Sequence, residues 1–123
     1  MSKTVLIADD EKNILISLEF LMKREGYNVV VAHDGQEAID AVQREHPDLV
    51  LLDVMMPKKT GLDVCQEVRA DPIFNDMPIL MLTAKGRDTD IAKGIAMGAN
   101  DYVVKPFSTR ELAEKVRNML GGI

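Results

Sequence analysis

The sequence predicts an α/β fold, an open, doubly wound parallel sheet with helices on both faces. Short runs of Val, Ile and Leu recur along the chain, and such runs are typical of strands buried on both faces. Longer segments with a helical spacing of apolar residues separate them, which indicates βα units and therefore parallel strands. The chain has 123 residues, too few for an eight-unit barrel, so an open sheet remains.

Five short apolar runs are the predicted strands. They cover residues 5–8, 29–32, 49–52, 79–82 and 102–104. Val, Ile and Leu dominate them, and no regular alternation of apolar and polar residues runs through them. Each strand is therefore predicted to be covered by helices on both sides.

The segments between these runs carry apolar residues at the spacing of one helix face. The predicted apolar faces lie within residues 14–22, 38–42, 62–68, 91–96 and 112–120. Residues 34–37 and 108–111 are predicted to form capping boxes, each at the start of a helix. Gly26 and Gly98 stand where glycine commonly ends a helix. We therefore expect one helix after each strand.

Composition limits the classes of protein that the sequence fits. The net charge is −5 and no basic stripe occurs, which argues against direct nucleic-acid binding. Cys65 is the only cysteine and cannot form an internal disulfide. The first apolar run is too short for a signal peptide or a membrane span. We expect a single soluble domain, residues 1–123, located in the cytoplasm and not on a membrane.

Polar residues stand at the predicted carboxyl ends of four strands, where open α/β sheets form their sites. They are Asp9 and Asp10 after the first run, Asp53 after the third, Thr83 after the fourth and Lys105 after the fifth. Clustered carboxylates repel each other unless a cation lies among them, and all-oxygen ligands favour Mg²⁺. A metal, an ammonium and a hydroxyl around one carboxylate are suited to phosphoryl transfer.

Four of these residues, each taken alone, have a purely structural explanation, whereas Asp9 has none. Asp10 is a common kind of helix cap, and Asp53 is a common turn residue. Thr83 could begin a turn, and an isolated Lys105 would be a solvated surface lysine. The combination at one edge of the sheet is what indicates a functional site.

The stretches "IADDE", "LLDVMMPKKTG", "MLTAK" and "DYVVKPF" together resemble the response-regulator receiver domain of two-component signalling. The resemblance covers essentially the whole chain, in the order and at the spacing of that family. It implies a flavodoxin-like fold with five parallel strands in the order 2-1-3-4-5 and five helices. It also implies a signalling domain and not an enzyme, apart from catalysis of its own phosphorylation and slow dephosphorylation.

The resemblance assigns roles to the residues at the acidic edge. Asp53 would be the phosphoacceptor. Asp10, Asp53 and the backbone carbonyl of Met55 would bind the cofactor Mg²⁺ directly, and Asp9 would act mainly through a bound water.

Three further roles follow from the same resemblance. Lys105 would hold the phosphoryl oxygens, and the Lys105–Pro106 peptide bond would be cis. Thr83 and Tyr102 would be the switch pair, with Tyr102 turning inward once Thr83 moves toward the phosphoryl group.

The implied partners are proteins. A phosphohistidine on a sensor histidine kinase or a histidine phosphotransfer protein would donate the phosphoryl group, and the switch would control an effector that the sequence does not identify. A homodimer through the last two helices and the strand between them is a further possibility that the family suggests.

The first predicted helix is apolar on two sides. Ile16 and Phe20 lie about half a turn away from the stripe predicted to face the core. Scattered surface hydrophobic residues are common and need no function. We nevertheless predict that Ile16 and Phe20, with Phe107, anchor the phosphohistidine partner, because this helix begins beside Asp10.

Two other classes of protein share parts of this pattern. A phosphatase of the haloacid dehalogenase type also uses a strand-end aspartate, but it requires a second acid two residues on, where this chain has Met55. A flavodoxin-like FMN carrier needs hydroxyls and amides in its first loop, where this chain has three acids, and the chain has no Trp to flank a flavin.

Overall fold

The computed structural model describes residues 2–121, so the ends of the predicted 1–123 domain lie outside the described part. The strands are β1 (Thr4–Ala8), β2 (Asn28–Ala32), β3 (Leu49–Asp53), β4 (Ile79–Ala84) and β5 (Asp101–Lys105). The helices are α1 (Lys12–Arg24), α2 (Gly35–Glu45), α3 (Gly61–Arg69), α4 (Asp88–Ala96), α5 (Thr109–Met119) and a 3₁₀ helix, η1 (Pro72–Phe74). All five predicted strands and five predicted helices are present; the sequence did not predict η1.

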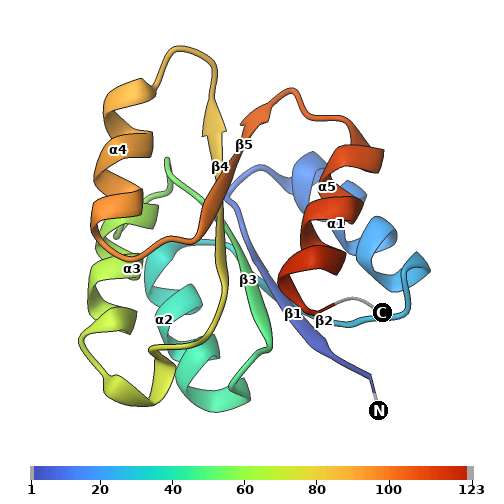
Figure 1. Ribbon diagram of the computed structural model, residues 1–123, viewed down its shortest axis with the longest axis horizontal. Helices are drawn as coiled ribbons and strands as arrows, with labels where there is room; N and C mark the ends of the chain where they lie inside the picture. The colour runs from blue at the N-terminus through green and yellow to red at the C-terminus, as the bar shows by residue number, and fades with distance from the viewer. Residues whose placement is uncertain (1, 122–123) are drawn as a thin grey trace.

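The strands form one parallel sheet in the order β2-β1-β3-β4-β5, which confirms the expected topology. Helices α1 and α5 cover one face, and α2, α3 and α4 cover the other (Figure 1). Ala8 pairs with Leu52, and Asp53 pairs with Leu82. The carboxyl ends of β1, β3 and β4 therefore meet at the same edge of the sheet, and Lys105 of β5 joins them opposite Ala84.

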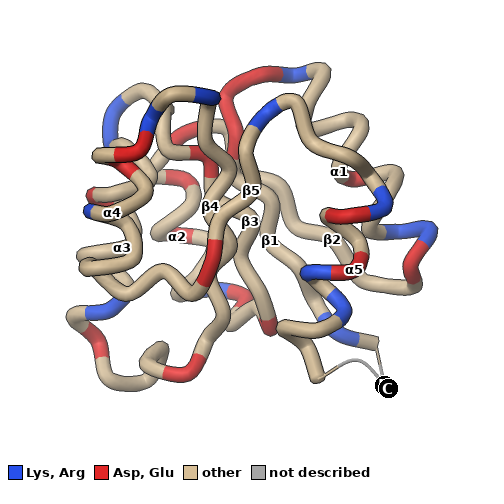
Figure 2. The backbone as a smooth tube through the Cα atoms, turned by 45° about the horizontal axis from the view of Figure 1, so that its top comes forward, with Lys and Arg blue, Asp and Glu red and all other residues tan. Residues whose placement is uncertain are grey.

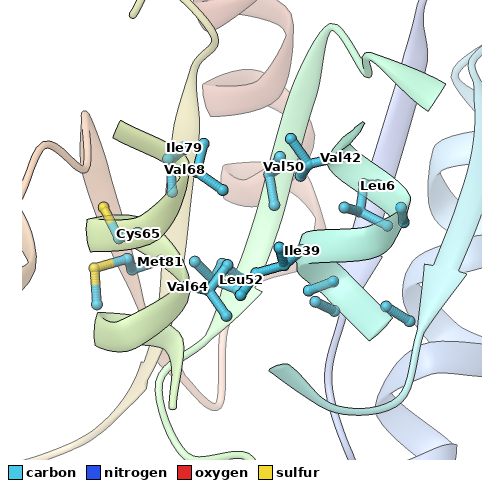
Figure 3. Close-up of a cluster of buried hydrophobic side chains, with 14 of the residues drawn as sticks. Leu6, Ile39, Val42, Val50, Leu52, Val64, Cys65, Val68, Ile79 and Met81 are labelled. Carbon is cyan, nitrogen blue, oxygen red and sulfur yellow. The ribbon is translucent and has the colours of Figure 1, made fainter. Parts of the chain in front are cut away.

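Alternate side chains of each strand enter two separate cores. Leu6, Val50 and Leu52 pack with α2 and α3 in the core shown in Figure 3. Val5 and Leu51 point the other way and pack with α1 and α5. Complete burial of each such side chain stabilises the fold by about 1.5–3 kcal/mol. The two cores hold the sheet rigid beneath the residues at its carboxyl edge.

The capping boxes predicted at α2 and α5 are each only half formed. The Asp34 carboxylate accepts a hydrogen bond from the Glu37 amide at 2.8 Å, as expected. The Glu37 carboxylate, however, accepts from the His33 amide and not from the amide of Asp34. At α5 the Ser108 hydroxyl accepts from the Glu111 amide at 3.2 Å, as expected, but the reciprocal bond of a capping box, from the Ser108 amide to the Glu111 carboxylate, is not formed. Both helices are thus capped by the predicted residues.

A complete capping box that the sequence analysis did not identify begins α3. Thr60 accepts from the amide of Asp63, and the Asp63 carboxylate accepts from the amide of Thr60. The helix then starts directly against the end of β3. A Cβ on Gly61 would lie 2.3 Å from the carbonyl oxygen of Asp53, so only glycine fits there. This close approach fixes the start of α3 relative to Asp53.

Glycines end two helices where the sequence predicted them. Gly26 follows α1 with φ +95°, and Gly98 follows α4 with φ +112°. Gly94 inside α4 has a different function, because a Cβ there would lie 2.1 Å from the Met81 sulfur. Glycine at that position lets α4 pack closely on β4. Among the described residues, no helix combines the length and apolar content needed to span a membrane.

Candidate functional site

Three carboxylates meet at the carboxyl edge of the sheet. Asp9 follows β1 directly, Asp10 is next to it, and Asp53 is the last residue of β3. Asp9 and Asp53 are buried and Asp10 is exposed. One oxygen of each lies within 4.8 Å of one oxygen of each other carboxylate. The fold thus brings together the three acids that the sequence predicted as a cluster.

The Lys105 ammonium lies inside this cluster. Its Nζ is 3.0 Å from Asp9 Oδ2 and 3.3 Å from Asp53 Oδ1, and the exposed Glu11 carboxylate lies 3.8 Å away. The Lys105–Pro106 peptide bond is cis, as the resemblance implied. In Figure 2 the acidic connection from β1 to α1 lies at the top of the molecule, beside basic positions at or just after the ends of β4 and β5.

Burial and a neighbouring negative charge both favour the protonated form of the Asp53 carboxyl. Burial is the main reason that its pKa rises to about 7, and the nearby Asp9 charge raises the pKa further. The charge and hydrogen bond of Lys105, together with the Met55 amide 3.4 Å from Asp53 Oδ1, oppose that rise. One lysine does not fully offset the cost of two buried carboxylates.

Burial also acts on the Lys105 ammonium, in the direction of a lower pKa. The hydrogen bond to Asp9 and the charges of Asp53 and Asp9 act the other way, and together they raise the pKa of Lys105 above its ordinary value. Lys105 is therefore fully charged over the physiological pH range.

The donor set fits a hard divalent cation. When all three carboxylates are ionised, one ammonium leaves two negative charges uncompensated at the edge of the sheet. A divalent ion with oxygen ligands would balance that charge, and the exposed Asp10 side leaves it open to solvent. The residues present therefore suit Mg²⁺, which commonly keeps several of its waters.

Thr83 and Tyr102 lie on neighbouring strands. Thr83 is buried beside the site, and its hydroxyl has only a long contact, 3.5 Å, with the carbonyl of Ala84. Tyr102 pairs with Met81 in the sheet, and its side chain is exposed. The Thr83 hydroxyl is thus nearly free to donate to a new acceptor near Asp53.

The three predicted partner-binding residues differ in exposure. Ile16 and Phe20 on α1 are 57% and 67% exposed. Phe107, by contrast, is half-buried and packs against the core beneath α1 and α5. The Arg24 guanidinium lies 5.9 Å from the centroid of the Phe20 ring, which is a cation–π geometry.

Two residues at the site were missed in the sequence analysis. The Glu11 amide donates to Asp9 Oδ1 at 2.9 Å and holds that carboxylate in place. Arg87, in the loop before α4, donates to the Met55 sulfur from 32 positions away in the chain. The acid run from Asp9 to Glu11 was a sequence signal for the first, whereas no pattern predicts the second.

Comparisons with known proteins agree with this geometry. A family profile described as the response regulator receiver domain matches residues 5–117. The chain therefore belongs to the response regulator receiver domains, signalling domains with a phosphoacceptor role. The membership favours this class over the phosphatase and the flavin carrier considered from the sequence.

Solved structures of the same class resemble the chain along nearly its whole length. A putative response regulator from Chloroflexus aurantiacus is 38% identical with a TM-score of 0.94, over 98% of this chain and 99% of that one. The chemotaxis protein CheY4 of Vibrio cholerae is 32% identical with a TM-score of 0.90, over 97% and 99%. NtrX from Brucella abortus is 26% identical with a TM-score of 0.89, over 98% of this chain but only 27% of NtrX.

Proposed function

We propose that the domain accepts a phosphoryl group on Asp53 from a phosphohistidine of a sensor kinase or a phosphotransfer protein, in a Mg²⁺-dependent reaction in the cytoplasm. The observation that carries this proposal is the buried Asp53 carboxylate, which has Asp9 and Asp10 within metal-ligand reach and the Lys105 ammonium at 3.3 Å. If Asp53 had only a structural role, a lysine and two further acids beside it would serve no purpose.

The residues have distinct parts in the transfer. An oxygen of Asp53 attacks phosphorus, the P–N bond breaks, and its electron pair returns to the imidazole nitrogen of the donor. The Lys105 ammonium contacts the transferring oxygens and offsets their charge. Bound by Asp10, Asp53 and the Met55 carbonyl, with Asp9 acting through a water, Mg²⁺ would supply the remaining positive charge.

The product changes the charge at the edge of the sheet. Phosphorylation adds roughly −1.5 to −2 charge and new acceptor oxygens. The Thr83 hydroxyl, which has only a weak contact, would donate to one of them. Its movement would leave space for the exposed Tyr102 side chain to turn inward, which would bias the surface of α4, β5 and α5 between two states.

The test of this function is labelling with a small phosphodonor. With acetyl phosphate and millimolar Mg²⁺, the intact protein should gain the mass of one phosphoryl group, because a small phosphodonor can reach Asp53 without a partner protein. In chelator the adduct should be absent or at least about a hundredfold slower to form, given the contribution of such charges to transfer. Equal labelling with and without the metal would contradict the assignment.

The exposed pair Ile16 and Phe20 is the surface we propose for the phosphohistidine partner, with Phe107 as a supporting residue beneath it. Helix α1 begins next to Asp10, so a partner that delivers a phosphoryl group to Asp53 must pass over its first turns. Two large apolar side chains, 57% and 67% exposed, offer a partner helix an anchor there. Because Phe107 is half-buried, we assign the larger effect to Phe20.

Phe20→Ala should slow transfer from the cognate phosphohistidine protein by about tenfold, since an exposed aromatic anchor commonly contributes 1–2 kcal/mol to binding. Acetyl phosphate labelling and the melting temperature should stay unchanged. Ile73→Ala is the matched control, because Ile73 is 65% exposed but lies in η1, before β4 and far from the carboxyl edge. A loss of rate with both phosphodonors, or with neither, would argue against the docking role.

Exposed apolar residues also lie on the surface that would contact an effector. Ile95 of α4 and Tyr102 of β5 are exposed on the part of the molecule that the switch would alter. We propose the face formed by α4, β5 and α5 as the contact for an effector or for a second copy of the domain. In NtrX the matching segment makes up only 27% of the chain, so this fold also occurs within longer proteins.

A further inference from the structure

A side-chain contact links the two loops that border Asp53 on the side of α4. Met55 lies in the loop after β3, and its amide donates to Asp53 Oδ1 at 3.4 Å. Arg87 is the last residue before α4, and its Nη2 donates to the Met55 sulfur at 3.3 Å. Met55 therefore contacts both the Arg87 guanidinium and the phosphoacceptor carboxylate.

This contact is a weak one for an arginine. A thioether sulfur is a poor acceptor, whereas a guanidinium has five donors and is best matched by carboxylate or phosphate oxygens. Arg87 also pairs with Asp90 in the first turn of α4, through its Nε and Nη2. Its side chain is 42% exposed and borders a surface hollow of about 300 Å³ lined by residues 86, 87, 89 and 90. The guanidinium thus has both spare donors and room to move.

We propose that Arg87 is a phosphoryl-sensing residue: when Asp53 is phosphorylated, the guanidinium leaves the Met55 sulfur and donates to the phosphoryl oxygens. The inference rests on the proposed function of Asp53 and deepens it. A phosphoryl group of charge about −1.5 to −2 is a far stronger acceptor than the sulfur that now occupies those donors. The two acceptors are two residues apart in the chain: Asp53 ends β3, and Met55 lies in the loop that follows it.

The change of acceptor by Arg87 would move α4 through the backbone. Arg87 is the N-cap residue of α4, and its carbonyl accepts from the Ile91 amide at 3.1 Å. Its side chain also holds Asp90 in the same turn. A shift of Arg87 toward Asp53 therefore pulls on the first turn of α4. This connection would act beside the Thr83 and Tyr102 pair and does not depend on it.

A purely local function for Arg87 is the alternative. In that case the pairing with Asp90 would simply support the first turn of α4, and the contact with Met55 would cover exposed sulfur. The two explanations differ in one respect: only a phosphoryl-sensing Arg87 changes the affinity of Asp53 for a phosphoryl analogue.

The experiment uses the full chain with Mg²⁺ and beryllium trifluoride, a phosphoryl analogue that coordinates an aspartate oxygen. Backbone amide NMR follows the titration in the wild type, Arg87→Ala and Lys85→Ala. Arg87→Ala should weaken beryllium trifluoride binding about tenfold, the loss expected for one charge-assisted hydrogen bond. It should also reduce the analogue-induced shifts of residues 88–91, leaving only the part that the Thr83 and Tyr102 pair transmits, while Mg²⁺ affinity alone and the melting temperature stay nearly unchanged.

Lys85→Ala is the matched control, because it removes one positive charge from the same loop. It should change binding by less than about twofold, as expected for an exposed charge. Asp90→Asn should tighten binding of the analogue, because it frees the guanidinium from its competing carboxylate. Equal binding by the wild type and Arg87→Ala, or an equal loss in Lys85→Ala, would overturn the assignment to Arg87. Failure of the wild type to bind the analogue, or undiminished binding by Asp53→Asn, would instead overturn the proposed function.

Discussion

Asp53→Asn is expected to abolish phosphoryl acceptance completely and, at the same time, to stabilise the protein in chelator. The first effect follows because an amide oxygen is not a nucleophile toward phosphorus. The second follows because the substitution removes a buried carboxylate that Asp9 repels. Intact-mass measurement after acetyl phosphate treatment checks the first effect, and thermal unfolding in chelator checks the second.

The stabilisation has a defined dependence on pH. The folded-state pKa of Asp53 is raised to about 7, so the folded protein keeps a proton that the unfolded chain has already lost. Ionisation of Asp53 therefore costs stability as the pH rises from about 4 to about 7, and the cost is complete above that window. The gain from Asp53→Asn should be negligible near pH 4 and on the order of 2–4 kcal/mol near pH 8, or about 10 °C in melting temperature.

Mg²⁺ should reverse this comparison. A ligand that binds only the native state adds stability by mass action, and Asp53 is one of its proposed ligands. Millimolar Mg²⁺ should raise the melting temperature of the wild type near pH 8 and leave Asp53→Asn nearly unchanged. If the variant is less stable than the wild type in chelator near pH 8, the repulsion between Asp53 and Asp9 is not the dominant energy in the metal-free site.

Much of the fold and of the candidate site was predictable because both follow short-range rules. Strand 49–52 was predicted from four consecutive apolar residues, and the structure extends it only to Asp53. The acids and Lys105 were expected together because parallel strands place their carboxyl ends at one edge. The strand order, in contrast, came from the resemblance to a family and not from the pattern of residues.

The features that the sequence did not predict depend on the exact path of the backbone. The Thr60 capping box has Asp63 in a position where the usual pattern has Glu or Gln. The half-buried state of Phe107 depends on how the loop after β5 packs on the core. The contact of Arg87 with Met55 joins two loops 32 positions apart, and no periodicity relates them.

Lys105→Met is expected to have the opposite effect on stability from Asp53→Asn. It preserves most of the side-chain bulk but leaves the buried carboxylates of Asp9 and Asp53 without their cation. Removing one partner of a buried ion pair typically costs about 3–5 kcal/mol. Near pH 8 in chelator we therefore expect a loss of about 3 kcal/mol, and acetyl phosphate labelling should slow by at least about a hundredfold. Lys85→Met, in an exposed position two residues after Thr83, is the control and should change stability by less than about 0.5 kcal/mol.

The stability lost in Lys105→Met should depend on pH because Asp53 titrates, and not because Lys105 does. The folded-state pKa of Lys105 is raised, so its stabilising effect is fully present below the ordinary lysine pKa of 10.5 and is lost only above it. Near pH 5 the Asp53 carboxyl of the variant takes up a proton, which removes one of the two stranded charges, so the cost should fall by about half. At pH 8, Lys105→Met should cost less stability when it is added to Asp53→Asn than when it is added to the wild type. Additive effects of the two substitutions would show that Lys105 and Asp53 do not interact energetically. That result would contradict the electrostatic explanation of the site given above.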